Sequence, residues 1–370
     1  MSHKSPEELF ASPIVQQTAF WQRVRQQMGE STLALNYNAT SDSVVCAKVP
    51  QGKVLADILV VIKNFDSQNS IAYVPYGPEL QPLDGMQGVY LEELAECLRS
   101  YLPKSCIAIR FDLCWESLWA KDDDFYDSNG WWLGPPEMAI QELRMNFGSV
   151  KRNLRKSSSN ILPTNTLFIN LAVTEERLLS QMKPKTRYNI GLSQRKGVEV
   201  KQLKLDQLSL WYQLYSETAK RNGIFLHSID YFAAVLAAKA TNTLSPAEVI
   251  LLLAEAEGIP LAAMFLVISG NRASYLYGAS SSDNRNYMAT YAIQWEAIRI
   301  AKGRGCVDYD MFGVAPRPDP SHPMYGLYRF KSGFGGEMYH TLGCWDYPLD
   351  DTRYNYLSTV EMVSQGYHLT

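Results

Sequence analysis

One order of predicted elements occurs twice along this chain, and it restricts the fold more than any other feature. A tyrosine-glycine turn, an amphipathic helix and an apolar strand ending in aspartate run from Tyr76 to Asp112, and again from Tyr277 to Asp310. In each copy an aromatic strand leads into the turn, and a predicted β-hairpin comes before that strand. Two segments with the same order and nearly equal spacing indicate two copies of one α/β unit.

The hairpins are predicted from apolar runs on either side of a turn signal. In the first copy, residues 44–47 and 54–62 flank Pro50-Gln51-Gly52, and in the second copy residues 250–254 and 261–268 flank a turn that contains glycine and proline. Apolar spacing predicts the helices of the two copies. We expect helices near 91–102 and 289–300, and further ones over 10–30, 174–183 and 206–222.

Length and composition exclude several classes of protein. At 370 residues the chain has room for two domains, and a formal net charge of −3 gives no general sign of a nucleic-acid-binding protein. Six scattered cysteines without a C-x-x-C pair and five histidines without ligand spacing predict neither disulfides nor a metal site. The N-terminus is polar and the longest apolar stretch, 261–268, is too short to cross a bilayer. We therefore expect a soluble, cytoplasmic protein.

A segment near the C-terminus combines aromatic rings, cations and glycines. Residues 325–336 read YGLYRFKSGFGG and include Arg329, Phe330 and Lys331. Composition alone favours an antiparallel strand, apolar at Leu327 and Phe330, that ends in a glycine turn. The alternative is a ligand site, in which the cations meet anionic oxygen, Phe330 stacks on a flat ring and glycine lets the backbone approach a ligand.

Two basic stretches are candidate binding surfaces. In residues 183–204 Tyr188, Asn189 and Ile190 interrupt the cations, and only Glu199 opposes them, which suits contacts with phosphates. Residues 144–156 carry five cations and no acid, and a solvated surface is the simpler interpretation there. The adjacent tryptophans at 131–132 stand in a loop, where they either line a binding site or pack one ring inward.

Several common catalytic motifs are absent from the sequence. It has no G-x-G-x-x-G after a strand, no P-loop, no G-x-S-x-G elbow and no H-E-x-x-H. A repeated hairpin, strand, helix and strand fits the N-acetyltransferase (GNAT) type of α/β fold. The R-x-x-G-x-G turn that binds pyrophosphate in acyl-CoA-dependent enzymes is missing after both tyrosine-glycine turns. Acyl-CoA is therefore not the expected donor.

Taken together, a set of motifs resembles the Fem family (FemABX) of non-ribosomal peptidyltransferases, over most of the chain. The order and spacing of the motifs make the combination specific. They are YVPYGP at 73–78, IRFD at 109–112, KTRYNI at 185–190 with RKGV at 195–198, QWEAI at 294–298, YD at 309–310 with Gly313, and YRFK at 328–331.

The resemblance implies two tandem acetyltransferase-like domains of mixed α/β type. We expect the first at 1–165 together with a C-terminal return at 318–370, and the second at 166–317. The long coiled-coil arm of some family members is not expected, because no charged heptad insertion interrupts residues 206–246. Residues 137–159 resemble an insertion relative to compact members of the family.

The resemblance also assigns site residues in three groups. The catalytic group is Lys331, Phe330, Asp112 and Tyr277; the acceptor-binding group is Arg23, Tyr231, His227 and Tyr76; and the tRNA-binding group is Lys183, Lys185, Arg187, Arg195, Lys196 and Arg329. His227 stands where a family member has arginine, which leaves open whether the acceptor is nucleotide-linked or lipid-linked. The alternative for Asp112 is a strand-end carboxylate paired with Arg110.

The family's activity implies the partners. Its members transfer an amino acid from aminoacyl-tRNA to an amine of the stem peptide of a peptidoglycan precursor, without a cofactor or metal. We therefore expect an aminoacyl-tRNA donor, a muropeptide acceptor, peripheral contact with the inner face of the membrane, and a monomer. An acyltransferase of the same fold acting on another amine and a non-catalytic tRNA-binding protein are the alternatives.

Overall fold

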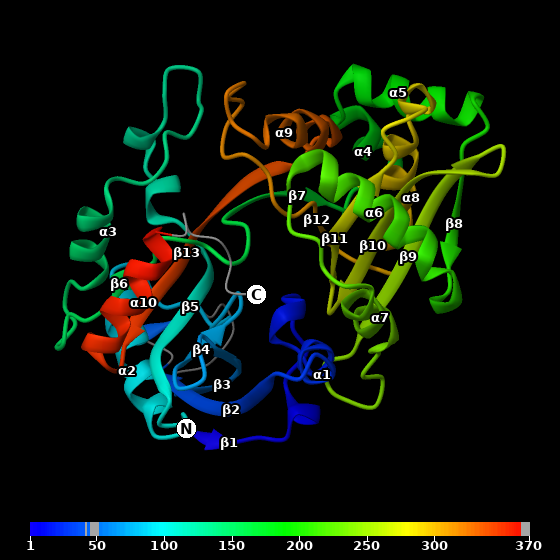
Figure 1. Cartoon of the computed structure of the whole chain (residues 1–370). Coiled ribbons are helices and arrows are strands. Elements are labelled where there is room, and N and C mark those ends of the chain that lie inside the picture. The colour runs from blue at the N-terminus through cyan, green and yellow to red at the C-terminus, as the bar shows by residue number, and fades with distance from the viewer. Residues whose placement is uncertain (41–42, 45–51, 364–370) are drawn as a thin grey trace. The chain divides into compact units, whose positions relative to one another are not determined.

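The computed structural model describes residues 1–40, 43–44 and 52–363, which fold as two units of similar architecture (Figure 1). Unit 1 contains Met1–Phe10, Gln16–Asn165 and the chain from His340 onward, and unit 2 contains Ala11–Val15 and Thr166–Tyr339. The sequence-based boundary puts the return to the first domain at 318, whereas unit 2 continues to Tyr339. The reason is that Tyr328 and Phe334 belong to the hydrophobic core of unit 2.

The sheet of unit 1 has the strand order β1-β2-β3-β4-β5-β13. Its neighbours are antiparallel except β4 and β5, which run parallel and are joined through helix α2 (Gln87–Arg99). The short strand β6 (Arg155–Lys156) pairs with β13. The strands are β1 (Ser2–His3), β2 (Ser31–Thr40), β3 (Lys53–Asn64), β4 (Ser70–Val74), β5 (Cys106–Glu116) and β13 (Glu337–Pro348).

The sheet of unit 2 has the order β8-β9-β10-β11-β12-β7 and repeats this plan. Only β11 and β12 are parallel, and helix α8 (Ala289–Gly303) joins them. The strands are β7 (Asn165–Asn170), β8 (Glu199–Leu203), β9 (Ala247–Ala256), β10 (Ile259–Ser269), β11 (Arg272–Ser280) and β12 (Asp308–Asp310). The expected pair of acetyltransferase-like α/β units is thus confirmed.

The crossover helices explain where the two cores lie. α2 buries Leu91, Leu94, Ala95 and Leu98, which recur at three- and four-residue intervals and therefore share one face. α8 does the same with Ile293, Ala297, Ile298 and Ala301. Each face packs on apolar side chains of its own sheet and forms one main core per unit.

The remaining helices connect or flank the sheets. They are α1 (Ala19–Gln27), α3 (Met138–Met145), α4 (Glu175–Gln181), α5 (Pro184–Arg195), α6 (Leu208–Asn222), α7 (Ile229–Ala237), α9 (Tyr325–Lys331) and α10 (Asp351–Val363). Two of them, α6 and α7, occupy the region 206–246 where the sequence predicts no long arm. Within the described residues, no helix is both long and apolar enough to cross a membrane.

Some predicted elements have different bounds or partners. β3 pairs with β2 (Ser31–Thr40), and not with the predicted run 44–47. Of that run only Val44 is described, in an isolated bridge to Pro82; residues 45–47 and the turn positions 50–51 lie outside the described residues. The first predicted hairpin was therefore wrong in the partner of residues 54–62. The actual partner, residues 31–40, directly follows the predicted helix over 10–30 and was not recognised as a strand.

The segment 325–336 is helical, so the strand interpretation is wrong. Residues 325–331 form α9, and a 3₁₀ turn, η8 (Ser332–Phe334), follows it. Tyr328 and Lys331 are buried three residues apart, which fits the helical period and not the two-residue period of a strand. Gly335 ends the turn with φ 83°, in the left-handed region that glycine adopts without strain.

Candidate functional site

Lys331 lies in the best-defined polar site of unit 2. It is the last residue of α9 and only 5% of its surface is exposed. Its Nζ donates hydrogen bonds to the carbonyl oxygens of Gly313 and Phe312, at 2.7 and 3.1 Å, and stands 5.1 Å from the centre of the Tyr275 ring. An ammonium has three N–H donors, so among the described residues one donor is left for a ligand.

A buried carboxyl group completes this site. The hydroxyl of Thr166 and the backbone N–H of Phe312 both donate to Oδ1 of Asp310, the latter at 2.8 Å. Burial lowers the pKa of Lys331 to about 7, against the attraction of Asp310, which raises it. Burial also raises the pKa of Asp310. Both groups are shifted toward their neutral forms, because desolvation outweighs their mutual attraction.

Glycine is required beside this site at one position. A Cβ on Gly278 would stand 1.7 Å from the hydroxyl of Tyr275. The hydroxyl of Tyr275 therefore has room in this position only because residue 278 has no side chain. The pKa of Tyr275 is raised to about 12 by burial, so its hydroxyl stays protonated.

Phe330 and Arg329 differ from Lys331 in their surroundings. The half-buried ring of Phe330 packs edge-on against Tyr291 and Phe334, with ring centres 5.1 and 5.3 Å away. The guanidinium of Arg329 is exposed and lies 5.8 Å from the ring of Tyr325. Phe330 is thus part of an aromatic cluster that supports α9, whereas Arg329 faces solvent.

Tyr277, Tyr231 and His227 form a second cluster in unit 2. The hydroxyl groups of the two tyrosines are 2.7 Å apart and hydrogen-bonded. The imidazole of His227 stacks on Tyr231 at 4.7 Å and meets Tyr277 edge-on at 6.0 Å. The cap of α7 fixes Tyr231, since its backbone N–H donates to the hydroxyl of Ser228. One residue of the predicted catalytic group, Tyr277, is therefore in direct contact with two of the predicted acceptor-binding group, Tyr231 and His227.

Three of the six predicted tRNA-binding residues lie on α5, and two more, Lys183 and Lys196, stand at its ends. The helix begins with Pro184, and its start is fixed on η8: the N–H of Lys183 donates to the carbonyl of Gly333 at 2.9 Å and its Nζ to the hydroxyl of Ser332 at 3.1 Å. The start of α5 therefore lies directly against the segment that follows Lys331. Lys185 is exposed on the first turn.

The other cations of α5 have unequal freedom. Arg187 donates to the carbonyl oxygens of Met182 and of Leu179, so it caps the end of α4. Arg195 lies 5.7 Å from the ring of the exposed Tyr188, and Lys196 lies 5.4 Å from the ring of Tyr287. An exposed aromatic ring beside a cation is a suitable surface for nucleic acid. Arg187 is less suited to bind nucleic acid, because its guanidinium is occupied by the capping contacts.

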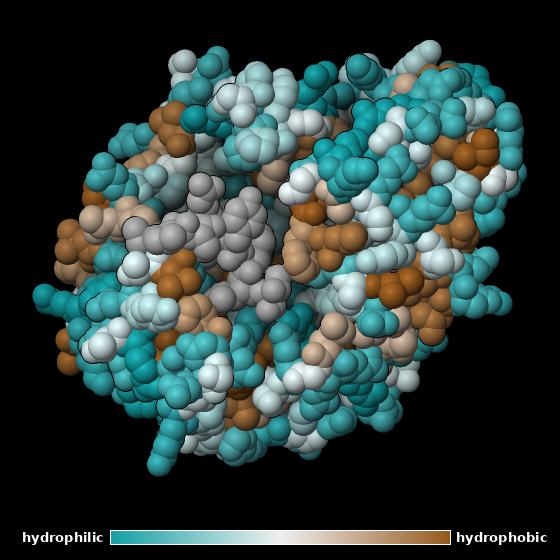
Figure 2. Space-filling view, in the orientation of Figure 1, coloured by the Kyte–Doolittle hydropathy of each residue, from teal (hydrophilic) through white to brown (hydrophobic). Residues whose placement is uncertain are grey.

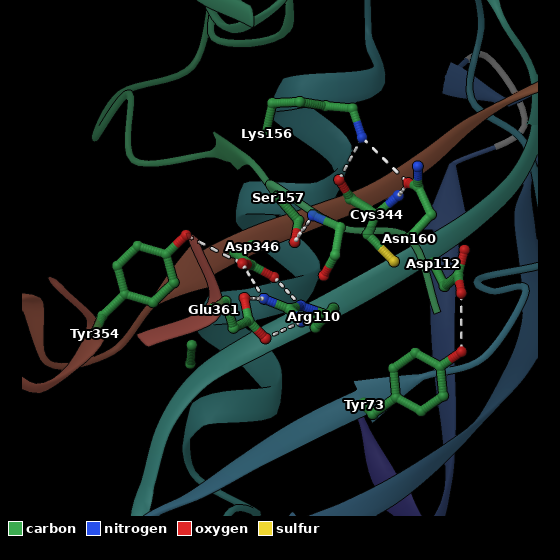
Figure 3. A network of polar contacts seen from close by, with 12 residues as sticks. Tyr73, Arg110, Asp112, Lys156, Ser157, Asn160, Cys344, Asp346, Tyr354 and Glu361 are labelled. Atoms are coloured by element: carbon green, nitrogen blue, oxygen red, sulfur yellow. Dashed lines mark hydrogen bonds and ion pairs between the residues drawn. The ribbon is translucent and has the colours of Figure 1, made fainter. Parts of the chain in front are cut away.

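Asp112 is fully buried in unit 1 (Figure 3). Its Oδ2 accepts hydrogen bonds from the hydroxyl of Tyr73 at 2.8 Å and from the backbone N–H of Leu162 at 3.0 Å. Burial raises the pKa of this carboxyl to about 6, although both hydrogen bonds lower it. Strand β5 continues to Glu116, so Asp112 lies within the strand and not at its end.

Arg110 does not pair with Asp112, so the simpler alternative for that carboxylate is wrong. Figure 3 shows its guanidinium between two carboxylates, those of Asp346 on β13 and Glu361 on α10. Both pairs have two hydrogen bonds of 2.7 to 2.8 Å. Side chains at i and i+2 of a strand share a face, but the ion pairs of Arg110 are with Asp346 and Glu361.

The remaining predicted acceptor residues also belong to unit 1. Tyr76 donates from its hydroxyl to the carbonyl of Pro163 at 2.6 Å, next to the segment that contacts Asp112. Arg23 is on α1, where its guanidinium is 4.0 Å from the carboxylate of Glu7. Trp132 is buried and stacks on His340 at 4.0 Å, while Trp131 is 40% exposed. One tryptophan of the loop therefore packs inward.

Some residues of these sites were missed from the sequence. Asp310 and Tyr275 lie near Lys331, and the hydroxyl of Tyr73 donates to Asp112. None of the three was assigned a role from the sequence, although Tyr73 and Asp310 belong to the motifs YVPYGP and YD. The repeat offered a signal, because Asp310 occupies the place in the second copy that Asp112 occupies in the first. Across the described residues, no group of three histidine, cysteine or acidic side chains is arranged to hold a metal ion.

Comparison with known proteins gives a consistent family. The FemAB family matches residues 12–244 and 237–362, and this chain belongs to that family. A crystal structure of FemX covers 93% of this chain and 94% of its own, with a TM-score of 0.69 and 18% identity, and therefore has the same fold.

Curated relatives are enzymes of staphylococci. The lipid II:glycine glycyltransferase of Staphylococcus epidermidis ATCC 35984 is 24% identical over an aligned length of 279 residues, and the match covers 60% of this chain and 67% of the relative. That of Staphylococcus saprophyticus is 22% identical over an aligned length of 262 residues, and the match covers 55% of this chain and 63% of the relative. That of Staphylococcus haemolyticus is 34% identical over 104 residues, only a quarter of its length.

Proposed function

We propose that this protein transfers an amino acid from aminoacyl-tRNA to an amine of the stem peptide of a lipid-linked peptidoglycan precursor. Family membership over most of the chain carries this proposal, and the names of the relatives, which act on lipid II, support the lipid-linked acceptor. His227 in place of an arginine fits an acceptor without a nucleotide diphosphate. We place the reaction at the cytoplasmic face of the membrane.

The chemistry is the aminolysis of an ester. The nitrogen of the acceptor amine attacks the carbonyl carbon of the aminoacyl ester, and the bond from that carbon to the ribose oxygen breaks. The amine loses a proton and the ribose oxygen gains one, so that an amide and a free tRNA result. Because the ester is already activated, the protein contributes mainly by aligning the two substrates and stabilising charge.

Lys331 is suited to stabilise the oxygen that becomes negative. Two carbonyl oxygens, of Phe312 and Gly313, hold its amine in place before the donor arrives. A donor with phosphates or a developing oxyanion would raise the pKa of Lys331 from about 7 and favour its charged form. The group is therefore positioned in advance and becomes charged where the charge is useful.

Asp112 and Tyr277 are suited to the acceptor. A carboxyl with a pKa of about 6 is largely ionised near neutral pH and can accept a proton from an ammonium group or orient it. The hydroxyl of Tyr277 is held by Tyr231 at 2.7 Å and can donate to or accept from a peptide substrate. We assign Tyr76 and Arg23 to acceptor binding because the family resemblance implies that role for them.

The donor is assigned to α5 and its neighbours. Lys183, Lys185 and Arg195 are exposed, and Tyr188 is 61% exposed between them. These side chains offer charge to phosphates and a flat ring to a base. Because α5 begins against η8, phosphates bound at its first turn would bring the 3′ end of a tRNA toward the element that carries Lys331.

The test is a transfer assay with the full chain. Radiolabelled amino acids on a complete pool of charged tRNA are offered together with a lipid-linked muropeptide in detergent micelles, and label in the muropeptide is the expected result. The same tRNA after mild alkaline deacylation, mixed with the free amino acids, is the control. Absence of transfer from every charged tRNA, or transfer from acetyl-CoA instead, would overturn the proposal.

A further inference from the structure

Helix α3 in unit 1 has an apolar face that points away from the core. Gln141 and Met145 are buried on its inner side. Ile140 and Leu143 lie three residues apart on another side of the helix, with 49% and 76% of their surfaces exposed, and Phe147, in the turn that follows the helix, is 78% exposed. A helix at the surface of a globular protein ordinarily has polar residues there.

Apolar side chains extend this face beyond the helix. Val150, in the turn that follows, is 89% exposed. We call Ile140, Leu143, Phe147 and Val150 the α3 surface. Figure 2 shows brown, hydrophobic atoms next to teal, hydrophilic ones along the edge of the molecule where Figure 1 draws α3. Contiguous exposed apolar residues of this kind mark interaction sites more often than chance exposure does.

The backbone under the α3 surface is firmly held. The buried carboxylate of Glu92 on α2 accepts the backbone N–H groups of Val150, Lys151 and Arg152, at 2.8, 2.8 and 3.2 Å. A Cβ on Gly88 would stand 1.6 Å from the carbonyl oxygen of Met145, so the end of α3 lies directly on α2. The apolar side chains are therefore presented by a fixed framework and not by a frayed segment.

Cations surround the α3 surface. Arg144, Lys151, Arg152 and Arg155 are all exposed. Lys151 also forms an ion pair with Glu96 at 2.9 Å, but no such pair with a carboxylate occurs for Arg152 or Arg155 among the described residues. The only acid within α3 is Glu142, and its Oε1 accepts the backbone N–H of Lys156 at 2.9 Å. The surface is thus apolar and basic.

We propose that the α3 surface docks on an anionic lipid bilayer, with its apolar side chains among the acyl chains and its arginines at the lipid phosphates. Exposed aliphatic and aromatic residues flanked by cations have the chemistry that interfacial helices use. A second copy of this chain is disfavoured as the partner of the α3 surface, because symmetric contact would bring the same cations together. The occupant is therefore a membrane surface.

The segment after the α3 surface leads to the candidate acceptor site. It continues through β6 to Lys156, whose Nζ donates to the carbonyl of Cys344 at 2.8 Å, opposite Asp112 in the sheet. It then reaches Leu162, which donates to Asp112 itself. Docking would hold this part of unit 1 at the membrane that contains a lipid-linked acceptor. In this respect the inference rests on the proposed function.

The first experiment is vesicle flotation of the full chain without tRNA or acceptor. Vesicles contain 30% phosphatidylglycerol in phosphatidylcholine, or phosphatidylcholine alone. We expect binding to the anionic vesicles that weakens with salt, and at least about tenfold weaker binding for Leu143→Gln/Phe147→Gln/Val150→Gln. Arg152→Gln/Arg155→Gln should weaken binding and reduce its dependence on salt.

The matched control is Leu205→Gln/Leu244→Gln/Ile259→Gln, which changes three residues of unit 2 with exposures of 50%, 59% and 48%. Its binding should equal that of the unaltered protein. Equal loss in both triple variants, or no binding of the unaltered protein to anionic vesicles, would refute the proposal. So would a dimer in light scattering that the α3 triple variant converts to monomers, since the surface would then be a contact between copies.

A transfer assay separates this inference from the proposed function. With a water-soluble muropeptide acceptor the α3 triple variant should transfer as well as the unaltered protein, and with a vesicle-embedded acceptor it should transfer at least about tenfold less. Failure of the unaltered protein with both acceptors refutes the proposed function and leaves the flotation result standing. Equal transfer to the vesicle-embedded acceptor by both proteins refutes the inference.

Discussion

Asp112 in unit 1 and Asp310 in unit 2 occupy equivalent places in the two copies of the repeat, and their hydrogen bonds are alike. Each lies on the strand that runs parallel to the strand before the crossover helix. Each accepts one side-chain hydroxyl and one backbone N–H: from Tyr73 and Leu162 in unit 1, and from Thr166 and Phe312 in unit 2. The duplicated fold therefore makes the same buried carboxyl site twice.

The lysines near the two carboxyls make the difference. In unit 1 the Nζ of Lys156 donates to the backbone carbonyl of Cys344 at 2.8 Å and to Oδ1 of Asn160 at 3.5 Å, and burial lowers its pKa. In unit 2 the Nζ of Lys331 donates to two carbonyls and its pKa falls to about 7. Lys156 belongs to β6, which follows α3, and Lys331 is the last residue of α9, so both lysines lie outside the repeated elements. We therefore expect the two copies to differ in function, because the added segments differ.

A second pair of positions shows the same divergence. Two residues before each carboxyl stand Arg110 and Asp308. Arg110 is buried with Asp346 and Glu361, since α10 covers this part of unit 1. Asp308 forms an ion pair of 3.4 Å with Arg272, and these side chains are 38% and 24% exposed. One ion pair is in the core and the other at the surface.

Replacing Arg110 should have the largest effect on stability. Arg110→Ala removes the cation that lies between the two buried carboxylates of Asp346 and Glu361, and we expect a loss of about 3–5 kcal/mol in the free energy of unfolding. Arg272→Ala removes the cation of the more exposed pair with Asp308 in unit 2 and should lose less than about 1 kcal/mol. Urea denaturation followed by tryptophan fluorescence measures both.

If Arg110→Ala does not fold, Glu361→Gln replaces it. That change keeps the shape and removes one charge, and we expect a loss of about 1–3 kcal/mol. Equal losses for the buried and the exposed pair would show that the divergence between the units has no energetic consequence.

Lys331 should matter for transfer far more than for stability. Lys331→Met removes the amine that we assign to the developing oxyanion, and we expect kcat/KM to fall by about 10²–10³. Stability at neutral pH should change by less than about 1 kcal/mol, because the variant no longer buries a charge that costs desolvation. Lys156→Met is the matched change in unit 1, and its transfer rate should stay within a few fold. A small effect of Lys331→Met on transfer would remove it from the mechanism.

The sequence predicts the repeat and the fold class, because helix and strand periods are local properties of apolar residues. It does not predict the partners of Arg110, which come from β13 and α10, more than two hundred residues away. For residues 325–336, glycine and aromatic content suggested a strand, whereas the three-residue spacing of Tyr328 and Lys331 determines a helix. The contact between Lys331 and Tyr275 likewise depends on chain segments brought together only in the folded unit.

Lys331 and Asp112 should contribute to the pH dependence of stability in opposite directions. The pKa of Lys331 is lowered from 10.5 to about 7, so between these values the unfolded chain binds more protons and stability rises with pH, by at most about 1.4 kcal/mol per pH unit. The pKa of Asp112 is raised from 3.8 to about 6, so across that interval the folded chain binds more protons and stability falls as pH rises.

Urea denaturation from pH 4 to 10 measures these slopes. Lys331→Met should abolish its share of the rise above pH 7, and Asp112→Asn its share of the fall below pH 6. A slope above pH 7 that persists unchanged in Lys331→Met would mean that the amine of Lys331 keeps an ordinary pKa.

The smallest effect is expected from the tyrosine beside each site. The Tyr73 hydroxyl donates to Asp112 and lowers its pKa, so Tyr73→Phe should move the acidic limb of the pH–rate profile upward by less than about one pH unit. Transfer should therefore fall by a few fold at pH 6 and little at pH 8. Tyr275→Phe keeps the ring near Lys331 and removes a hydroxyl that is not among the groups that shift the pKa of that lysine. A shift of the acidic limb in Tyr275→Phe but not in Tyr73→Phe would assign that limb to unit 2 and not to Asp112.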